Sequence, residues 1–188
     1  MFRVARSTRD RLALRLTSRV LATLALGACA HGRGAVAPPA LAVATLRSST
    51  GTTIGTATLR QVDGAIQVDL DVRGIADGAH GVHFHTVGRC DAPDFATAGG
   101  HLNPKGTKHG AKNPAGPHAG DLPNLIISGG QSSGWTAKTL RIAADASPGG
   151  LFDADGTAIV VHAMPDDEMT DPSGSSGARI ACGVIEKR

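Results

Sequence analysis

Six histidines and one aspartate form the pattern that most constrains this 188-residue chain. Their order is His83, His85, His101, His109, His118, Asp121 and His162. Residues i and i+2 of a β-strand point to one face, so His83 and His85 in the run GVHFHTVGRC can face the same ion. The next four ligand candidates lie in a Gly-, Pro-, Asn- and Lys-rich stretch without a hydrophobic period, which predicts a long functional loop. Imidazoles and a carboxylate in this arrangement suit zinc or copper and indicate a two-metal site with one shared ligand.

The other two histidines fall outside this pattern. A single histidine is more often a surface or hydrogen-bonded structural residue than a ligand. His80 precedes the histidine strand and is out of register with its pair, so we expect a structural role. His31 lies in a polar segment, and we expect it to be solvated.

Eight segments of β type are separated by turn residues, and the chain has no convincing helical period. The segments are 41–47, 52–60, 65–72, 80–87, 124–128, 136–142, 157–162 and 180–186. Apolar and polar residues alternate most clearly in AIQVDLDV, residues 65–72, as in a half-buried strand. Two connections, 88–123 and 163–179, are far longer than hairpin turns. The pattern predicts an all-β sandwich or barrel with two long functional loops.

The N-terminus has the features of a targeting signal. Six arginines precede a short apolar run, Val20 to Ala28, which ends at Cys29 and is too short to span a bilayer. Leu26-Gly27-Ala28-Cys29 resembles the cleavage box of bacterial lipoproteins, in which the cysteine is acylated; simple signal-peptide cleavage is the alternative. We predict a signal peptide over 1–29, a flexible tether over 30–40 and a single domain over 41–188.

The charge of the chain does not favour a nucleic-acid partner. The net charge of +3 depends on the six arginines of the first 29 residues; the remainder carries 13 basic and 15 acidic side chains, a net charge of −2. Lys105, Lys108 and Lys112 cluster in the predicted metal loop. They form either an ordinary solvated face or a local positive funnel.

The cysteine count predicts one disulfide. If Cys29 carries lipid, Cys90 and Cys182 remain, and an even pair in an exported chain indicates a disulfide. The alternatives are two buried free thiols or metal ligands, and the second is disfavoured because neither cysteine belongs to a Cys-x-x-Cys pair.

These motifs give the chain a close resemblance to the bacterial, exported Cu/Zn superoxide dismutases, over about residues 41–188. The matching motifs are HGVHFH at 80–85, GGHLNP at 99–104, KHG at 108–110, GPHAGDLPNL at 116–125, FDADGTAIVVHA at 152–163 and GARIACGVI at 177–185. The resemblance implies an eight-stranded Greek-key β-barrel or sandwich. It also implies one copper and one zinc ion per subunit.

The resemblance assigns a role to each candidate residue. Copper would be bound by His83, His85, His101 and His162, and zinc by His101, His109, His118 and Asp121. His101 would bridge the two ions and supply a proton to the product. Arg179 would attract the superoxide anion. Asp166 would link a copper histidine to a zinc histidine, with Asp167 as the competing choice, and Cys90 and Cys182 would form the family's disulfide.

The implied reaction is the conversion of superoxide to dioxygen and hydrogen peroxide by copper redox cycling, with a structural zinc. The expected location is the periplasm, either free or tethered to a membrane through Cys29, as an antioxidant defence of the cell envelope. The loop after His162 has no lysine before Arg179, so the loop lysines 105, 108 and 112 are the candidates for steering superoxide. The sequence is compatible with both a monomer and a homodimer.

Three other functions compete with this interpretation. A copper carrier or metal buffer would keep the fold without fast turnover, but Arg179 and the complete ligand set argue against it. A copper-only dismutase is disfavoured because His109, His118 and Asp121 are all present. A purely structural lipoprotein would require the histidines to be accidental.

Overall fold

The computed structural model describes residues 37–188, which belong to one compact unit. The predicted signal peptide, the acylation candidate Cys29, His31 and most of the predicted tether lie outside the described residues. Over the part that is described, no helix is long and apolar enough to cross a membrane.

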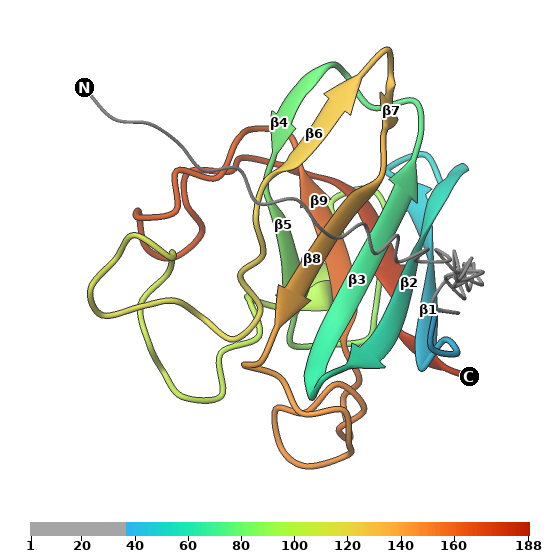
Figure 1. The fold of residues 1–188 in the computed structure, drawn as a ribbon. Coiled ribbons are helices and arrows are strands. Elements are labelled where there is room, and N and C mark those ends of the chain that lie inside the picture. Colours follow the sequence, from blue (N-terminus) through green and yellow to red (C-terminus); the bar gives the residue numbers. More distant parts are fainter. Residues whose placement is uncertain (1–36) are drawn as a thin grey trace, which may run out of the picture. The chain divides into compact units, whose positions relative to one another are not determined.

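Eleven strands and one short 3-10 helix, η1 (Ala96–Ala98), make up this unit. The strands are β1 (Ala42–Ser48), β2 (Thr53–Val62), β3 (Ala65–Val72), β4 (Gly78–His80), β5 (Val82–His85), β6 (Leu125–Ser128), β7 (Gln131–Ser132), β8 (Trp135–Thr139), β9 (Ala158–His162), β10 (Arg179–Val184) and β11 (Glu186–Lys187). The larger sheet has the order β5-β9-β10-β1-β2-β3-β8, with β11 beside β1, and the smaller sheet has the order β4-β6-β7. All pairings are antiparallel. Figure 1 shows the strands curled around a common core, which confirms the predicted all-β barrel class.

Alternating side chains of the large sheet form the core. In β3 the residues Ile66, Val68, Leu70 and Val72 are buried, as the alternation predicts. Strands β5 and β9 are buried at every position because loops cover their outer faces. The two strands that carry three of the candidate ligands therefore belong to the most enclosed part of the barrel.

The predicted continuous strand over 80–87 is wrong in one respect. The chain pairs with β6 up to His80 and with β9 from Val82 onward, so the segment changes sheets at Gly81. A β-carbon at Gly81 would lie 2.8 Å from that of Ser176, so this change of sheet needs a glycine. The predicted strand over 136–142 also ends early, at Thr139.

The two long connections lie on the same side of the barrel, at the left of Figure 1. One backbone hydrogen bond joins them within residues 37–188, from Lys112 N–H to Glu168 O at 2.9 Å, and side-chain bonds such as Asn113 Nδ2 to Met169 O add to it. Arg179 is the first residue of β10, opposite His162, rather than the last residue of the loop before it. The fold thus brings both loops and the ends of β5 and β9 to one place.

Candidate metal centre

Four histidines from two strands and a loop converge in the interior. His83 and His85 come from β5, His162 ends β9, and His101 lies in the long loop, bridged to His85. One ligand atom from each residue lies within 4.8 Å of all the others. The converging ring nitrogens, Nδ1 of His83 and Nε2 of His85, His101 and His162, are buried without a hydrogen-bond partner. Buried polar atoms are rarely left unpaired, so this group has the properties of a metal site.

The opposite ring nitrogens of three of these histidines are held by acceptors. His83 Nε2 donates to Asp166 Oδ2 at 2.8 Å, and His85 Nδ1 donates to Gly99 O at 2.9 Å. His162 Nδ1 donates to Gly177 O at 3.1 Å. These bonds place the proton on the outer nitrogen, so the lone pair of each inner nitrogen faces the shared interior.

Burial favours the neutral form of the three strand histidines, which is the form that binds metal. Desolvation lowers the pKa of His83 to about 3, the pKa of His85 to about 2 and the pKa of His162 to about 4. Neutral imidazole donors suit copper and zinc.

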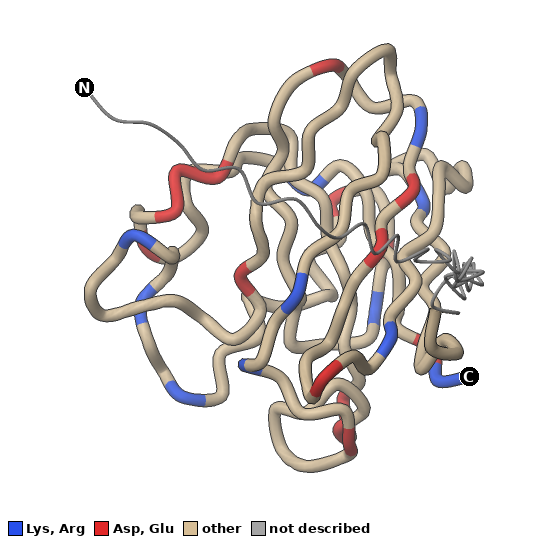
Figure 2. Tube along the Cα trace, in the orientation of Figure 1, with Lys and Arg blue, Asp and Glu red and all other residues tan. Residues whose placement is uncertain are grey.

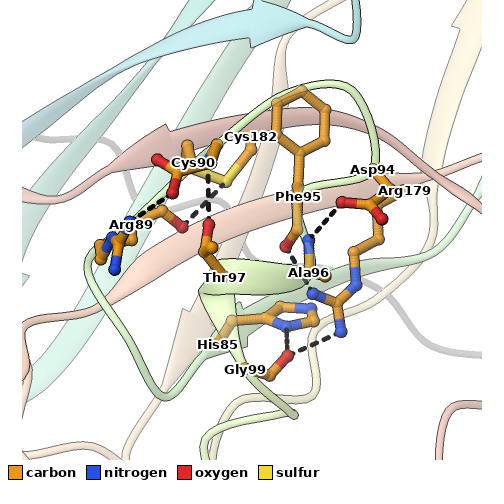
Figure 3. Close-up of a disulfide and its surroundings, with 11 residues drawn as sticks. His85, Arg89, Cys90, Asp94, Phe95, Ala96, Thr97, Gly99, Arg179 and Cys182 are labelled. Carbon is orange, nitrogen blue, oxygen red and sulfur yellow. Dashed lines mark hydrogen bonds and ion pairs between the residues drawn. A yellow bond between two sulfur atoms is a disulfide. The ribbon is translucent and has the colours of Figure 1, made fainter.

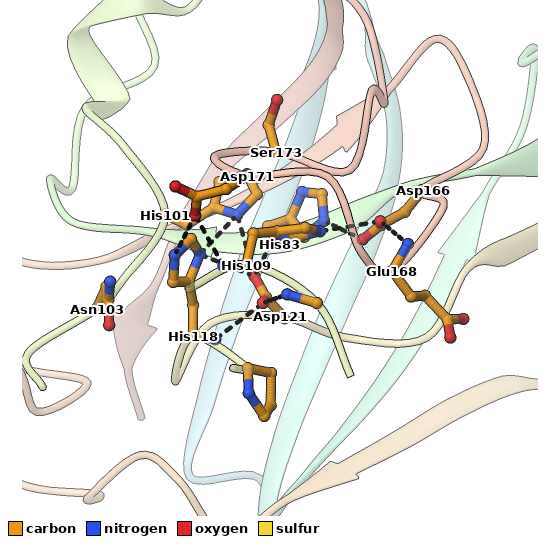
Figure 4. Close-up of polar contacts among 12 residues, drawn as sticks. His83, His101, Asn103, His109, His118, Asp121, Asp166, Glu168, Asp171 and Ser173 are labelled. Carbon is orange, nitrogen blue, oxygen red and sulfur yellow. Dashed lines mark hydrogen bonds and ion pairs between the residues drawn. The ribbon is translucent and has the colours of Figure 1, made fainter. Parts of the chain in front are cut away.

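A second group shares His101 with the first. Figure 4 shows this second group together with His83. Asp121 Oδ1 is 3.0 Å from His101 Nδ1, 3.1 Å from His109 Nδ1 and 3.3 Å from His118 Nδ1. The Nδ1 atoms of His101 and His118 are 3.4 Å apart. A tetrahedral zinc ion with bonds of about 2.0–2.1 Å holds its donor atoms about 3.3 Å apart. These four distances suit the donor atoms of a tetrahedral site.

His83 also lies within reach of this second group, since one atom each of His83, His101, His109 and Asp121 lie within 4.8 Å of one another. The geometry favours His118 as the fourth member. The Nε2 of His83 is bonded to Asp166, and its Nδ1 belongs to the first group.

Two carboxylates order the second group. Asp121 Oδ2 accepts the backbone N–H groups of Gly110 and His118, each at 2.9 Å. Asp166 Oδ1 accepts from His109 Nε2 at 2.9 Å while Oδ2 bonds His83, so Asp166 joins the two groups. Burial opposes the charge of His109, but Asp121 and Asp166 raise its pKa to about 9. Binding of a metal at His109 must therefore displace a proton.

The competing residue Asp167 is placed differently. Its side chain is exposed and accepts the backbone N–H groups of Met169 and Thr170, at 2.9 and 2.8 Å. Its carboxylate makes no bond to a histidine within residues 37–188.

Arg179 lies at a surface cleft of about 740 Å³, whose lining includes Gly99, Gly177 and Asp94. Its Nη1 donates to Phe95 O and its Nη2 to Gly99 O, both at 2.6 Å (Figure 3). Gly99 O also accepts from His85, so one carbonyl oxygen connects the guanidinium to the first histidine group. The cation is thereby held one carbonyl group away from His85 of that group.

The predicted disulfide is present. Cys90 and Cys182 are bonded across 92 residues of sequence, with Cα atoms 5.6 Å apart. The bond ties the start of the long loop to β10 (Figure 3). It thereby fixes the segment that supplies the carbonyl oxygens for Arg179.

Two of the three loop lysines form ion pairs, and Lys105 has none within residues 37–188. Lys108 pairs with Asp171 at 3.0 Å and Lys112 with Glu168 at 3.3 Å. Figure 2 shows basic positions of one loop beside acidic positions of the other. For Lys108 and Lys112 the structure thus favours a paired, solvated face over a positive funnel.

His80 has structural contacts. It is buried, and its ring nitrogens contact His162 O at 2.8 Å and Ala76 O at 2.9 Å. It belongs to neither histidine group, in agreement with the role expected from its position.

Sequence analysis did not identify Asn124. Its Nδ2 donates to Asp166 O and its Oδ1 accepts the Asp166 N–H, both at 2.8 Å. Asn124 therefore fixes the backbone of the residue that joins the two groups. The residues around Asn124, in the run LPNL, do not indicate this role, because its partner Asp166 is 42 residues away in the sequence.

The chain is similar to known superoxide dismutases. The family profile described as copper/zinc superoxide dismutase (SODC) matches residues 53–185. Cu-Zn superoxide dismutase 1 of Aquifex aeolicus (strain VF5) is 40% identical over 138 residues, which cover 72% of this chain and 82% of that protein. The Cu-Zn superoxide dismutase of Caulobacter vibrioides is 37% identical over 148 residues, 77% of this chain and 85% of that protein. The crystal structure of a SOD-like protein from Bacillus subtilis superposes with a TM-score of 0.73 at 34% identity, covering 77% of this chain and 97% of that one.

Proposed function

Because the chain belongs to the copper/zinc superoxide dismutase family, a family of oxidoreductases, we propose that it dismutates superoxide by redox cycling of copper beside a structural zinc. The observation that carries this proposal is the set of buried ring nitrogens without hydrogen-bond partners in the two adjoining groups. A site of this kind fits metal ions better than any hydrogen-bonded arrangement of the same side chains.

The first group is the proposed copper site, with His83, His85, His101 and His162 as ligands. Three of these imidazoles have their outer nitrogens fixed by acceptors, so their orientation is set before metal binds. The shared histidine, His101, offers Nε2 to this group and Nδ1 to the next.

The second group is the proposed zinc site, with His101, His109, His118 and Asp121 as ligands. The support is the spacing of 3.0 to 3.4 Å among the donor pairs described above, which suits tetrahedral zinc. A complete second group favours a dismutase with both metals over a copper-only one.

When bound, copper supplies the one-electron redox change and zinc holds the loop. The side chains of the protein bind the anion, position it and supply a proton. Arg179 is the proposed binding group for superoxide, since its guanidinium is fixed at the cleft beside His85. His101 Nε2 is the proposed atom that takes up a proton and gives it to the peroxide product. Asp166 is the proposed link between a copper and a zinc ligand.

A non-enzymatic copper carrier is the main competing function. A carrier needs exchangeable copper but no anion-binding cation beside its copper ligands. The two hydrogen bonds that hold Arg179 beside the first histidine group favour the dismutase.

We also propose that the enzyme acts in the cell envelope, as an antioxidant defence. The disulfide between Cys90 and Cys182 suits an oxidising compartment. Residues 1–29 are the proposed signal peptide, residues 30–40 the tether to a domain over 41–188, and Cys29 the proposed lipid attachment site. Mass spectrometry of the mature N-terminus tests both processing and acylation: an unmodified N-terminus at another residue would contradict the anchor.

The activity is tested by pulse radiolysis of the protein loaded with known equivalents of copper and zinc. We expect rapid decay of superoxide that requires copper and slows with added salt, because the substrate is an anion. The zinc-only protein is the matched control. A fully loaded protein without turnover would overturn the dismutase proposal and favour metal handling.

A further inference from the structure

One surface arginine holds the segment that carries two of the proposed zinc ligands. Arg141 follows β8, and its Nε donates to His118 O at 3.1 Å while its Nη2 donates to Asp121 O. Within residues 37–188, no other group donates to either carbonyl oxygen. Arg141 is thus the one donor to the carbonyl oxygens of His118 and Asp121 in the described residues, whereas the backbone bonds to Leu102 and Phe84 hold Gly120 between them.

The barrel fixes the place from which Arg141 reaches the loop. Thr139 at the end of β8 is 2% exposed, and Ile142 is 5% exposed and packs in the core. The Arg141 N–H also bonds Thr139 Oγ1 at 3.2 Å. The neighbouring Leu140 is 76% exposed, so the chain bulges outward between two buried anchors. A rigid base of this kind lets one side chain set the position of a loop.

The fork shape of the guanidinium suits this task. It offers several N–H groups in a fixed plane, so two carbonyl oxygens bound to one guanidinium are held at a fixed spacing. The His118 and Asp121 carbonyls belong to the residues whose Nδ1 and Oδ1 atoms lie 3.3 Å apart in the second group. A lysine, with a single nitrogen at its tip, does not hold the same two oxygens in one plane.

We propose that Arg141 is a positioning residue for the zinc site: it fixes the backbone of His118 and Asp121 so that both donor atoms are in place before zinc binds. This inference rests on the proposed function, since it assigns zinc to the second group. Arg141 touches neither metal nor substrate, and it acts through the two ligands.

A second basic residue near Arg141 supplies a matched control. A cleft of about 240 Å³ beside the second group is lined by Lys138 and Arg141 together with Asp121, Asp166 and Glu168. Lys138 has the same charge as Arg141, but its side chain makes no hydrogen bond or ion pair in the described part of the chain. Lys138→Ala therefore removes a positive charge from the cleft and leaves the loop contacts intact.

The test is zinc affinity, measured by competition with a chromophoric chelator for the full protein and for Arg141→Ala, Arg141→Lys and Lys138→Ala. Loss of a group that orients ligands typically weakens metal binding about 10- to 100-fold. We expect that loss for Arg141→Ala, a smaller loss for Arg141→Lys and almost none for Lys138→Ala. Cobalt substituted for zinc should show a changed visible spectrum in Arg141→Ala alone.

Each outcome separates the two proposals. If the unaltered protein binds no zinc, the proposed function fails together with this inference. If it binds zinc tightly and Arg141→Ala binds equally well with an unchanged cobalt spectrum, the positioning role alone is wrong. Equal losses in Arg141→Ala and Lys138→Ala would also overturn it, because the effect would then be one of charge. Should Arg141→Ala not fold, Arg141→Lys decides, since it retains the charge and loses the fork.

Discussion

Replacing Asp166 with asparagine tests how the two proposed metal sites are joined. The Asp166 carboxylate accepts from His83 Nε2 at 2.8 Å, from His109 Nε2 at 2.9 Å and from the backbone N–H of Glu168 at 2.6 Å. Burial raises the pKa of Asp166, but the bonds from His109 and His83 outweigh it and hold the pKa below its usual range. Asp166 is therefore an acceptor at both oxygens near neutral pH.

Asparagine keeps the size of the side chain but has only one acceptor oxygen. If that oxygen keeps the position of Oδ1, it still serves His109 and the Glu168 N–H, and the new amide group faces the N–H of His83. Loss of a hydrogen bond to a charged group costs about 1.5–3 kcal/mol, which corresponds to about 10- to 100-fold in affinity. Because His83 is a proposed copper ligand, we expect Asp166→Asn to weaken copper binding by this factor and zinc binding less.

The assay is separate competition titration of each metal against a chelator, together with the visible absorption of the copper form. Asp167→Asn is the matched control, since within residues 37–188 its carboxylate bonds Met169 and Thr170 of its own loop and no histidine. Copper affinity within about twofold of the unaltered protein would refute the reasoning. An equal loss in Asp167→Asn would refute the choice between the two aspartates.

Three further changes test the fold and the electrostatics. Removing the disulfide with Cys90→Ala and Cys182→Ala should lower the free energy of unfolding by up to about 4–5 kcal/mol, from the chain entropy of the closed loop; a loss below about 1 kcal/mol in non-reducing denaturation would contradict this. Arg179→Ala should lower the superoxide rate constant at low salt about tenfold or more and flatten its dependence on ionic strength; pulse radiolysis showing an unchanged salt dependence would contradict the steering role. Replacing Lys108 and Lys112 with glutamine should change the free energy of unfolding by less than about 1 kcal/mol, since both ion pairs are exposed. The superoxide rate constant should change less than about twofold, because Asp171 and Glu168 already offset these charges. A large fall in that rate constant would instead support the positive funnel.

Much of the fold was predictable from periodicity. The alternation in residues 65–72 gives the buried and exposed faces of β3 directly. The change of sheet at Gly81 was not predictable, because the glycine is required by contact with Ser176, which lies far along the chain. The disulfide followed from counting cysteines, and the structure contains it.

The candidate site was predictable as a set of residues but not as a geometry. The i, i+2 spacing of His83 and His85 places both on one strand face, and the structure brings the other candidates to it. Their ligand roles remain predictions until metal binding is measured. Asn124 and Arg141 had no signal in the sequence, because each acts on backbone atoms of residues 20 to 42 positions away.

The direction in which two imidazoles of the proposed copper site point depends on backbone carbonyls of glycines. His85 donates to Gly99 O and His162 donates to Gly177 O, and both glycines have φ values near +75°. A β-carbon would lie 2.4 Å from Thr86 Oγ1 at Gly99 and 2.9 Å from Met164 Cγ at Gly177. A side chain at either position is therefore disfavoured twice, by backbone conformation and by contact. The histidines thus supply the donor atoms. Two glycines, which have no side chain that could bind metal, determine which nitrogen of His85 and His162 faces the interior.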